Sequence, residues 1–215
     1  RRVETNTIFD LASVTKVIAT TTAAMICIDK GLFNLDDKVI KYIPEFNNNG
    51  KDAVTIRHLL LHNSGLPSFK PFYKTLKTAK EVIADIYNSN LNSTPETKYV
   101  YSDLGMITMG KIIEKVSGTS LDQFCTKEIF NPLGMRNTFF NPSNDIKSFI
   151  PPTENDNYWR KRLLQGEVHD EASSLLNGIA GHAGLFSNTK DIAILLQMLM
   201  QNGFYQGKQF IKKET

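Results

Sequence analysis

The sequence is short of several features that define other classes of protein. Its 215 residues include only 2 cysteines, Cys27 and Cys125, which cannot form a disulfide framework, and Cys27 is expected to be a small core residue. No uninterrupted apolar run reaches ~18 residues, so we expect no transmembrane segment. The formal net charge of +3 is too small for a dedicated nucleic-acid binder. With 41% hydrophobic and 22% charged residues, the composition is that of a globular protein.

Short motifs of several large enzyme classes are also missing. There is no GxxxxGK[ST] or GxGxxG phosphate loop, no HExxH or CxxC motif and no GxSxG turn. His58 and His62 lie four residues apart, as metal ligands on a helix can, but no acid in the segment completes a site. We expect both to be structural, and we interpret His169-Asp170-Glu171 as a solvated loop. The sequence therefore predicts no metal and no cofactor.

Helical periodicity dominates the remaining sequence. Residues 14–28 are apolar almost all round and predict a buried helix that stops near Gly31. Further helices are expected at 55–62 behind Thr55, from Thr78 with Glu81 in a capping box, at 109–116, from Ser120, and at 192–203. Strand-like sequence is nearly absent, the best candidate being 98–101, and 141–160 reads as a long surface loop. We expect a mostly helical chain with a single domain over 1–215.

The pattern Ser-x-x-Lys occurs at Ser13 and again at Ser187. On a helix this spacing puts the hydroxyl and the ammonium on one face, where the lysine can help to activate the serine. Ser187 stands just before a helix, and we interpret it as a cap. Ser13 opens the most apolar helix, where a buried Lys16 is costly unless it has a partner or a function. Capping remains the alternative role for Ser13.

A third candidate element is Tyr101-Ser102-Asp103-Leu104-Gly105, between the strand-like stretch and a helix. A phenol placed beside an ammonium can act as a general base. If these elements pack together, Tyr101 would meet Ser13 and Lys16. The alternative is a packed aromatic ring followed by Asp103 as a helix N-cap.

Four ordered stretches resemble a known group of proteins: FDLASVTK, IRHLLLHNSGLP, YSDLGMITMGKIIEKVSGTS and GIAGHAGLFSNTKDIAILLQML. They resemble the serine β-lactamase and penicillin-binding-protein superfamily, in the branch of class C β-lactamases and their esterase relatives. The resemblance implies that Ser13 and Lys16 form the first catalytic motif, and that Tyr101 and Asp103 match the second, Tyr-x-Asn. Asp103 in place of asparagine favours a charged Lys16 and shifts the role of base to Tyr101. This departure favours a general serine hydrolase over a β-lactamase.

The third motif of the superfamily, in its His-x-Gly form, matches His182-Ala183-Gly184 by its letters. Because we expect this segment to run straight into a helix rather than a strand, a structural role for His182 is favoured over a catalytic one. The resemblance then implies an α-rich fragment of an α+β serine β-lactamase-like fold, with the helical domain mostly present and the antiparallel sheet strands largely missing at both ends. Such a chain, incomplete at both termini, is expected to be weakly active or inactive alone, because one oxyanion donor would be missing.

The resemblance also implies the function. It predicts a bacterial serine hydrolase that acts through an acyl-enzyme on amide or ester bonds, in a β-lactam, a D-amino-acid peptide or a small ester. The partner would be a small-molecule or peptide substrate and no nucleic acid, in the cell envelope or periplasm; the sequence does not decide the oligomeric state. Two alternatives stay open: a non-catalytic envelope-binding module of the same fold, and an unrelated helical interaction domain.

Overall fold

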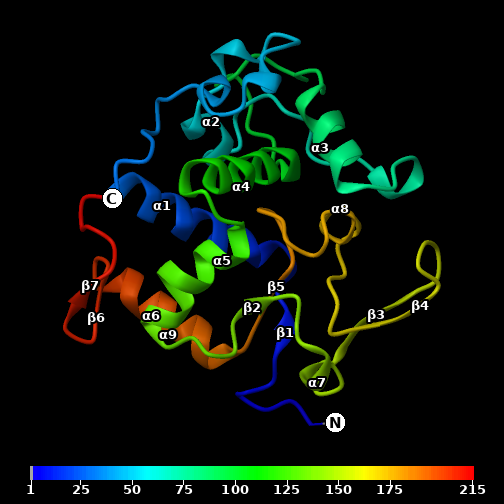
Figure 1. The fold of residues 1–215 in the computed structure, drawn as a ribbon, viewed down its shortest axis with the longest axis vertical. Coiled ribbons are helices and arrows are strands. Elements are labelled where there is room, and N and C mark those ends of the chain that lie inside the picture. Colours follow the sequence, from blue (N-terminus) through cyan, green and yellow to red (C-terminus); the bar gives the residue numbers. More distant parts are fainter. Residues whose placement is uncertain (1) are drawn as a thin grey trace.

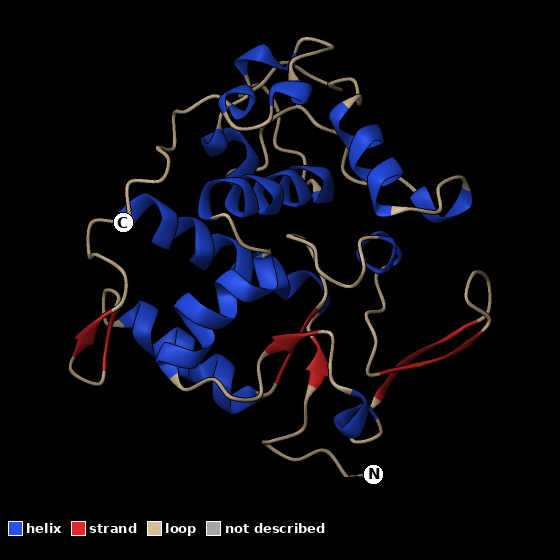
Figure 2. Cartoon of the chain, viewed as in Figure 1, coloured by secondary structure: helices blue, strands red, loops and turns tan. Residues whose placement is uncertain are grey.

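The computed structural model describes residues 2–215, which form a helical body with three small antiparallel sheets (Figures 1 and 2). The α-helices are α1 (Thr22–Asp29), α2 (Ile56–Leu60), α3 (Ala79–Tyr87), α4 (Asp103–Ser117), α5 (Leu121–Cys125), α6 (Asn131–Leu133), α7 (Asn144–Lys147), α8 (Glu171–Leu175) and α9 (Thr189–Met200). Helix α4 lies at the centre and packs against α1, α2 and α5. Its apolar residues are buried along almost its whole length, which makes it the core around which the site is built.

The predicted buried helix is present and forms one continuous helical segment over residues 12–29. It begins with a 3-10 turn at Ala12–Val14, continues as a π-helical stretch at Lys16–Thr21 and ends as α1. Over Ala12–Asp29 its mean hydropathy is 1.2, enough by length and composition alone to cross a membrane, contrary to our expectation that no segment would be. Since 56% of that window is buried inside the protein, it also fits the core helix of a globular body.

Two helix starts follow the local signals in the sequence. Thr55 accepts a hydrogen bond from the backbone N–H of His58 and donates its own N–H to the His58 ring, so the two residues form a capping box at α2. Thr78 and Glu81 form the predicted capping box at α3. Such caps involve neighbours in sequence, and for that reason the sequence alone shows them.

Two other helix starts differ from the prediction. Ser102, rather than Asp103, caps α4, because its Oγ accepts the N–H of Gly105 at 3.1 Å. Asn188, rather than Ser187, caps α9. Ser187 instead lies in a strand, and its buried hydroxyl contacts Thr138 Oγ1 at 2.7 Å. A hydroxyl engaged with a distant segment is not available as a cap.

The principal sheet brings together three segments that are far apart in the sequence. Its order is β1 (Phe9–Asp10), β5 (Leu185–Ser187) and β2 (Phe139–Phe140), with antiparallel pairing throughout (Figure 2, red). Residues 182–184 therefore do lead into a strand, and our expectation that they run straight into a helix was wrong. The strand expected at 98–101 is not formed; this segment is held instead by contacts with the end of α2.

The stretch 141–160 is more ordered than the long loop we expected. It contains α7 and β3 (Pro152–Asp156), which pairs with β4 (Arg162–Gln165) in a hairpin. The buried carboxylate of Asp156 accepts backbone N–H groups at the turn and pairs with Arg160, whose Nε lies 2.9 Å away. Arg160 also donates to the carbonyls of Val168 and His169. The hairpin is held by polar side chains, so alternation of apolar residues does not reveal it.

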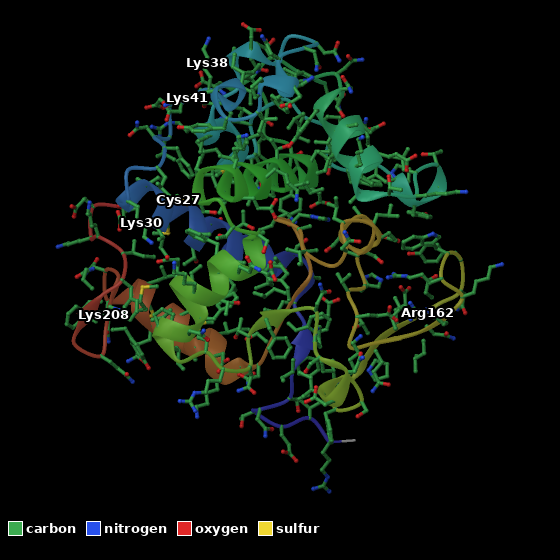
Figure 3. All side chains as sticks on the ribbon, viewed as in Figure 1. Cys27, Lys30, Lys38, Lys41, Arg162 and Lys208 are labelled. Carbon is green, nitrogen blue, oxygen red and sulfur yellow. The ribbon has the colours of Figure 1, made fainter. Side chains whose placement is uncertain are left out.

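The C-terminal residues pack back against the end of α1. The hairpin of β6 (Phe204–Tyr205) and β7 (Lys208–Gln209) follows α9, and Lys212 and Thr215 then hydrogen-bond to Asp29 at the end of α1. Cys27 on α1 (labelled in Figure 3) is a buried free thiol, as expected for a core residue, and Cys125 is a buried free thiol too. Burial raises the pKa of the Cys27 thiol to about 12, which leaves it unreactive at neutral pH.

Candidate active site

Ser13 stands at the surface where the first helical segment begins. Its neighbour Ala12 has a φ of 45°, a left-handed conformation that is costly for a residue with a Cβ. Asp10 stabilises this turn, because one carboxylate oxygen accepts the N–H of Ala12 at 2.8 Å and the other accepts the N–H of His169 at 2.7 Å. Burial raises the pKa of Asp10, although these backbone hydrogen bonds oppose the shift. The backbone before Ser13 is thus held in one strained conformation.

Lys16 lies beneath Ser13 and is only 4% exposed. Its Nζ donates to Ser13 Oγ at 2.9 Å and to the carbonyl oxygen of His182 at 3.1 Å. The same Nζ forms an ion pair with Asp103 Oδ1 at 2.7 Å. An ammonium has three N–H groups, and three oxygens surround this one. The arrangement provides a buried, fully partnered cation one helical turn from the serine.

Tyr101 and Asp103 reach the same place from the start of α4. The Tyr101 ring centroid is 4.6 Å from Lys16 Nζ, and the residue is 41% exposed. Nothing within residues 2–215 hydrogen-bonds to the Tyr101 hydroxyl, which leaves it available to a ligand. The structure therefore brings Ser13, Lys16, Tyr101 and Asp103 together, although they come from two helices separated by more than eighty residues of chain.

His182 supports the site through its backbone rather than its side chain. Its carbonyl receives the Lys16 ammonium, while its ring is 1% exposed and Nε2 lies 2.7 Å from Asp170 Oδ1. Asp170 also caps α8 by accepting the N–H of Ser173. Burial opposes ionisation of Asp170, but its bond to His182 and the nearby charges outweigh that effect and lower its pKa to about 2. The Asp170 carboxylate therefore has a structural role, whereas we expected His169-Asp170-Glu171 to be a solvated loop.

His62, which the sequence analysis left as a structural residue, lies directly beside Tyr101. The two ring centroids are 4.7 Å apart, and His62 Nδ1 accepts the backbone N–H of Ser102 at 3.1 Å. Its position inside IRHLLLHNSGLP, next to a turn, is the signal that could have placed it near the site.

The four histidines have separate partners, with His58 against Glu96 and His169 against Glu154. No cluster of three metal-ligating side chains occurs within residues 2–215.

A cavity of about 450 Å³ opens beside Asp103. It lies between the N-terminal end of α4, the start of α8 and the short 3-10 helix Phe72–Lys74. Leu104, Ile107 and Phe72 supply apolar walls, while Asp103 and Glu171 supply carboxylates. This volume suits part of a small organic or peptide ligand next to the reactive groups.

The chain matches known proteins over nearly its whole length. A family model described as Beta-lactamase matches residues 1–211. The chain is 36% identical to the N-acetylmuramyl-L-alanine amidase of Bacillus subtilis strain 168, a match that covers 100% of this chain and 54% of the relative. It is 35% identical to an Escherichia coli K12 protein with the provisional name D-alanyl-D-alanine carboxypeptidase, over 98% of this chain and 55% of that one.

A solved structure shows the same fold. The class C beta lactamase from Rhodobacter sphaeroides superimposes with a TM-score of 0.76 at 21% identity, covering 96% of this chain and 55% of that chain. The chain thus spans about half the length of the relatives and structure that it matches. These matches agree with the resemblance seen in the sequence, and the chain belongs to the beta-lactamase family, within the superfamily of serine β-lactamases and penicillin-binding proteins.

Proposed function

We propose that the protein is a serine hydrolase in which Ser13 forms an acyl-enzyme. The observation that carries this proposal is the contact of Ser13 Oγ with the buried Lys16 ammonium, which Asp103 and the His182 carbonyl hold in place. A buried lysine paired in this way is costly to maintain unless it has a function. The proteins that the chain is similar to include an amidase and a class C β-lactamase.

Each residue has a distinct role in the proposed reaction. Ser13 Oγ attacks a carbonyl carbon, and the backbone N–H of Ser13 serves as one oxyanion donor. Tyr101 takes the proton that leaves Ser13 and delivers it to the leaving group, while the Lys16 ammonium donates a hydrogen bond to Ser13 Oγ. Asp103 keeps Lys16 oriented through their ion pair. In the second half of the reaction Tyr101 activates the water that hydrolyses the ester.

The substrate we propose is an amide bond in a peptide that contains D-amino acids, located in the bacterial cell envelope. The name of the amidase supports an amide bond as the target, and the name of the carboxypeptidase, which specifies D-alanyl-D-alanine, supports D-amino acids. Asp103 favours it over a β-lactam, because the β-lactamases that the sequence resembles carry Asn at this position. The cavity beside Asp103 would hold part of the peptide on the acyl side.

Covalent labelling tests the proposal. The protein in its full natural length is incubated with a fluorophosphonate and, separately, with a penicillin, and its intact mass is measured. We expect a single fluorophosphonate adduct that is absent in Ser13→Ala, since the Ala side chain removes the nucleophile and little else. Ser187→Ala, at the other Ser-x-x-Lys, is the matched control and should retain the adduct. A wild-type protein that gains no mass with either reagent would instead favour a non-catalytic module.

A further inference from the structure

His62 is attached to the chain on both sides of Tyr101. Its carbonyl oxygen accepts the N–H of Val100 at 2.8 Å, and its Nδ1 accepts the N–H of Ser102 at 3.1 Å. The ring of His62 then packs on the ring of Tyr101 between these two anchors. The segment 98–101 has no strand pairing of its own. Its position therefore depends on these contacts together with Ser68, whose Oγ donates to the Tyr101 carbonyl at 2.7 Å and whose carbonyl accepts the N–H of Asp103.

The backbone of His62 shows that this placement is maintained at a cost. Its φ is 55°, in the left-handed region, which histidine adopts more readily than bulky residues but still infrequently. The strained conformation turns the chain sharply at the end of α2. It allows one residue to present its carbonyl and its ring to the same neighbouring segment.

The hydrogen bond from Ser102 also specifies the chemical state of the ring. A nitrogen that accepts an N–H carries no proton, so His62 is the neutral tautomer with its proton on Nε2. Burial and the nearby Lys16 lower the pKa of His62, and Asp103 opposes them in part. The other groups that face the ring are Tyr99, at 6.1 Å between centroids, and Tyr101.

We propose that His62, in its neutral form, is a positioning residue that holds Tyr101 over Lys16 for the proton transfers at Ser13. This inference rests on the proposed serine-hydrolase function and adds a residue to it. When His62 gains a second proton, Nδ1 becomes a donor and can no longer accept from Ser102. The segment that carries Tyr101 then loses the hydrogen bond on its C-terminal side to His62, only the bonds to the His62 carbonyl and to Ser68 remain, and acylation slows.

Two substitutions distinguish the contribution of the hydrogen-bond acceptor of His62 from that of its ring. His62→Asn retains an oxygen close to the position of Nδ1 and tolerates a left-handed backbone, whereas His62→Phe keeps a ring but removes the acceptor. We expect His62→Asn to acylate with fluorophosphonate at a rate within about 3-fold of wild type, and His62→Phe to be slowed roughly 10- to 100-fold at saturating reagent, as for a displaced catalytic group. Thermal unfolding of each variant confirms that the compared proteins are folded.

The pH dependence of the acylation rate distinguishes a positioning role of His62 from a purely structural one. Protonation of His62 should add an acid-side fall in the acylation rate of wild type to the fall that protonation of the Tyr101 base gives in both proteins. This added fall should be absent in His62→Asn, which keeps Lys16, Tyr101 and Asp103. The ¹⁵N chemical shift of His62 should show Nδ1 unprotonated at neutral pH. If His62→Phe does not fold, the comparison of wild type with His62→Asn decides.

The possible failures are distinguishable. If wild type is labelled at Ser13 but both variants react like wild type, or if Nδ1 carries a proton at neutral pH, the role of His62 is overturned and the hydrolase function stands. If the added acid-side fall persists unchanged in His62→Asn, the role of His62 is likewise overturned. If wild type gains no Ser13 adduct, the proposed function is overturned and the role of His62 goes with it.

Discussion

At the scale of single residues, the central feature is that Lys16 acts as a donor. Its ammonium gives hydrogen bonds to Ser13 and to the His182 carbonyl and pairs with Asp103. A cation in this state has no lone pair to take the Ser13 proton. We therefore propose as base the oxygen of Tyr101, which has no hydrogen-bond partner within residues 2–215 and which takes the proton from Ser13 in its phenolate form; the ring centroid lies 4.6 Å from the ammonium.

Tyr101→Phe tests this division of roles. The Phe ring keeps the packing on Lys16 and His62, and the lost hydroxyl has no hydrogen-bond partner within residues 2–215, so we expect the free energy of unfolding to change by less than about 0.5 kcal/mol. Acylation should slow by roughly 10²- to 10⁴-fold, the usual contribution of general acid–base catalysis. Stopped-flow acylation and urea unfolding measure the two quantities. Unimpaired acylation would assign the role of base to another group.

The four residues placed in the site from the sequence are those with a local pattern or a matching motif. Ser13 and Lys16 share a helix face, and Tyr101 and Asp103 start another helix. Asp10 and His62 were not placed there, because each accepts a hydrogen bond from a backbone N–H in a distant segment, that of His169 for Asp10 and that of Ser102 for His62. Such contacts depend on tertiary structure and leave no spacing in the sequence.

At the scale of elements, the N-terminal end of α8 is linked to Lys16 through His182. Asp170 caps this helix and pairs with His182, whose carbonyl receives Lys16. The caps of α2 and α3 were predictable because each involves residues three apart, whereas the pair Asp170–His182 joins a helix start to a separate segment. The hairpin β3–β4 escaped prediction for the same reason, as Arg160 binds carbonyls outside it.

Asp170→Asn tests the charge of this cap. The pKa of Asp170 falls from 3.8 to about 2 on folding, so its ionised form stabilises the fold above pH ~4, and this stabilisation is lost as the pH falls toward 2. The shift corresponds to about 2 kcal/mol at neutral pH. Asn keeps the capping oxygen, so Asp170→Asn should be destabilised by up to that amount at pH 7 and should lose less stability between pH 4 and 2.

Urea unfolding at a series of pH values measures this difference. Asp52→Asn, at an exposed position with no side-chain hydrogen bond within residues 2–215, is the control and should follow wild type. Parallel stability curves for wild type and Asp170→Asn between pH 4 and 2 would show that the Asp170 charge does not contribute to folding.

At the scale of the whole molecule, the site exists because segment 178–184 lies between α4 and the first helical segment. Gly181 accepts a hydrogen bond from Thr20 at 2.7 Å, and the next carbonyl, that of His182, accepts from Lys16. Gly181 is also pressed against α4, since a Cβ there would lie 2.0 Å from the Met106 carbonyl oxygen. The sequence indicated the helices but not this close approach, which only the packed structure reveals.

Gly181→Ala therefore tests whether this packing positions Lys16. The added methyl group must push the segment away from α4, and we expect a loss of about 1–3 kcal/mol in the free energy of unfolding, as for an overpacked core. The same shift moves the His182 carbonyl from Lys16, so acylation of Ser13 should slow in the protein that remains folded. Gly105→Ala is the matched control, because a Cβ there meets its nearest atom at 3.7 Å, an ordinary contact, and alanine favours the helix. Urea unfolding and acylation rates on both variants decide the matter: a Gly181→Ala protein as stable and as reactive as Gly105→Ala would mean that Lys16 is positioned by Asp103 and Ser13 alone.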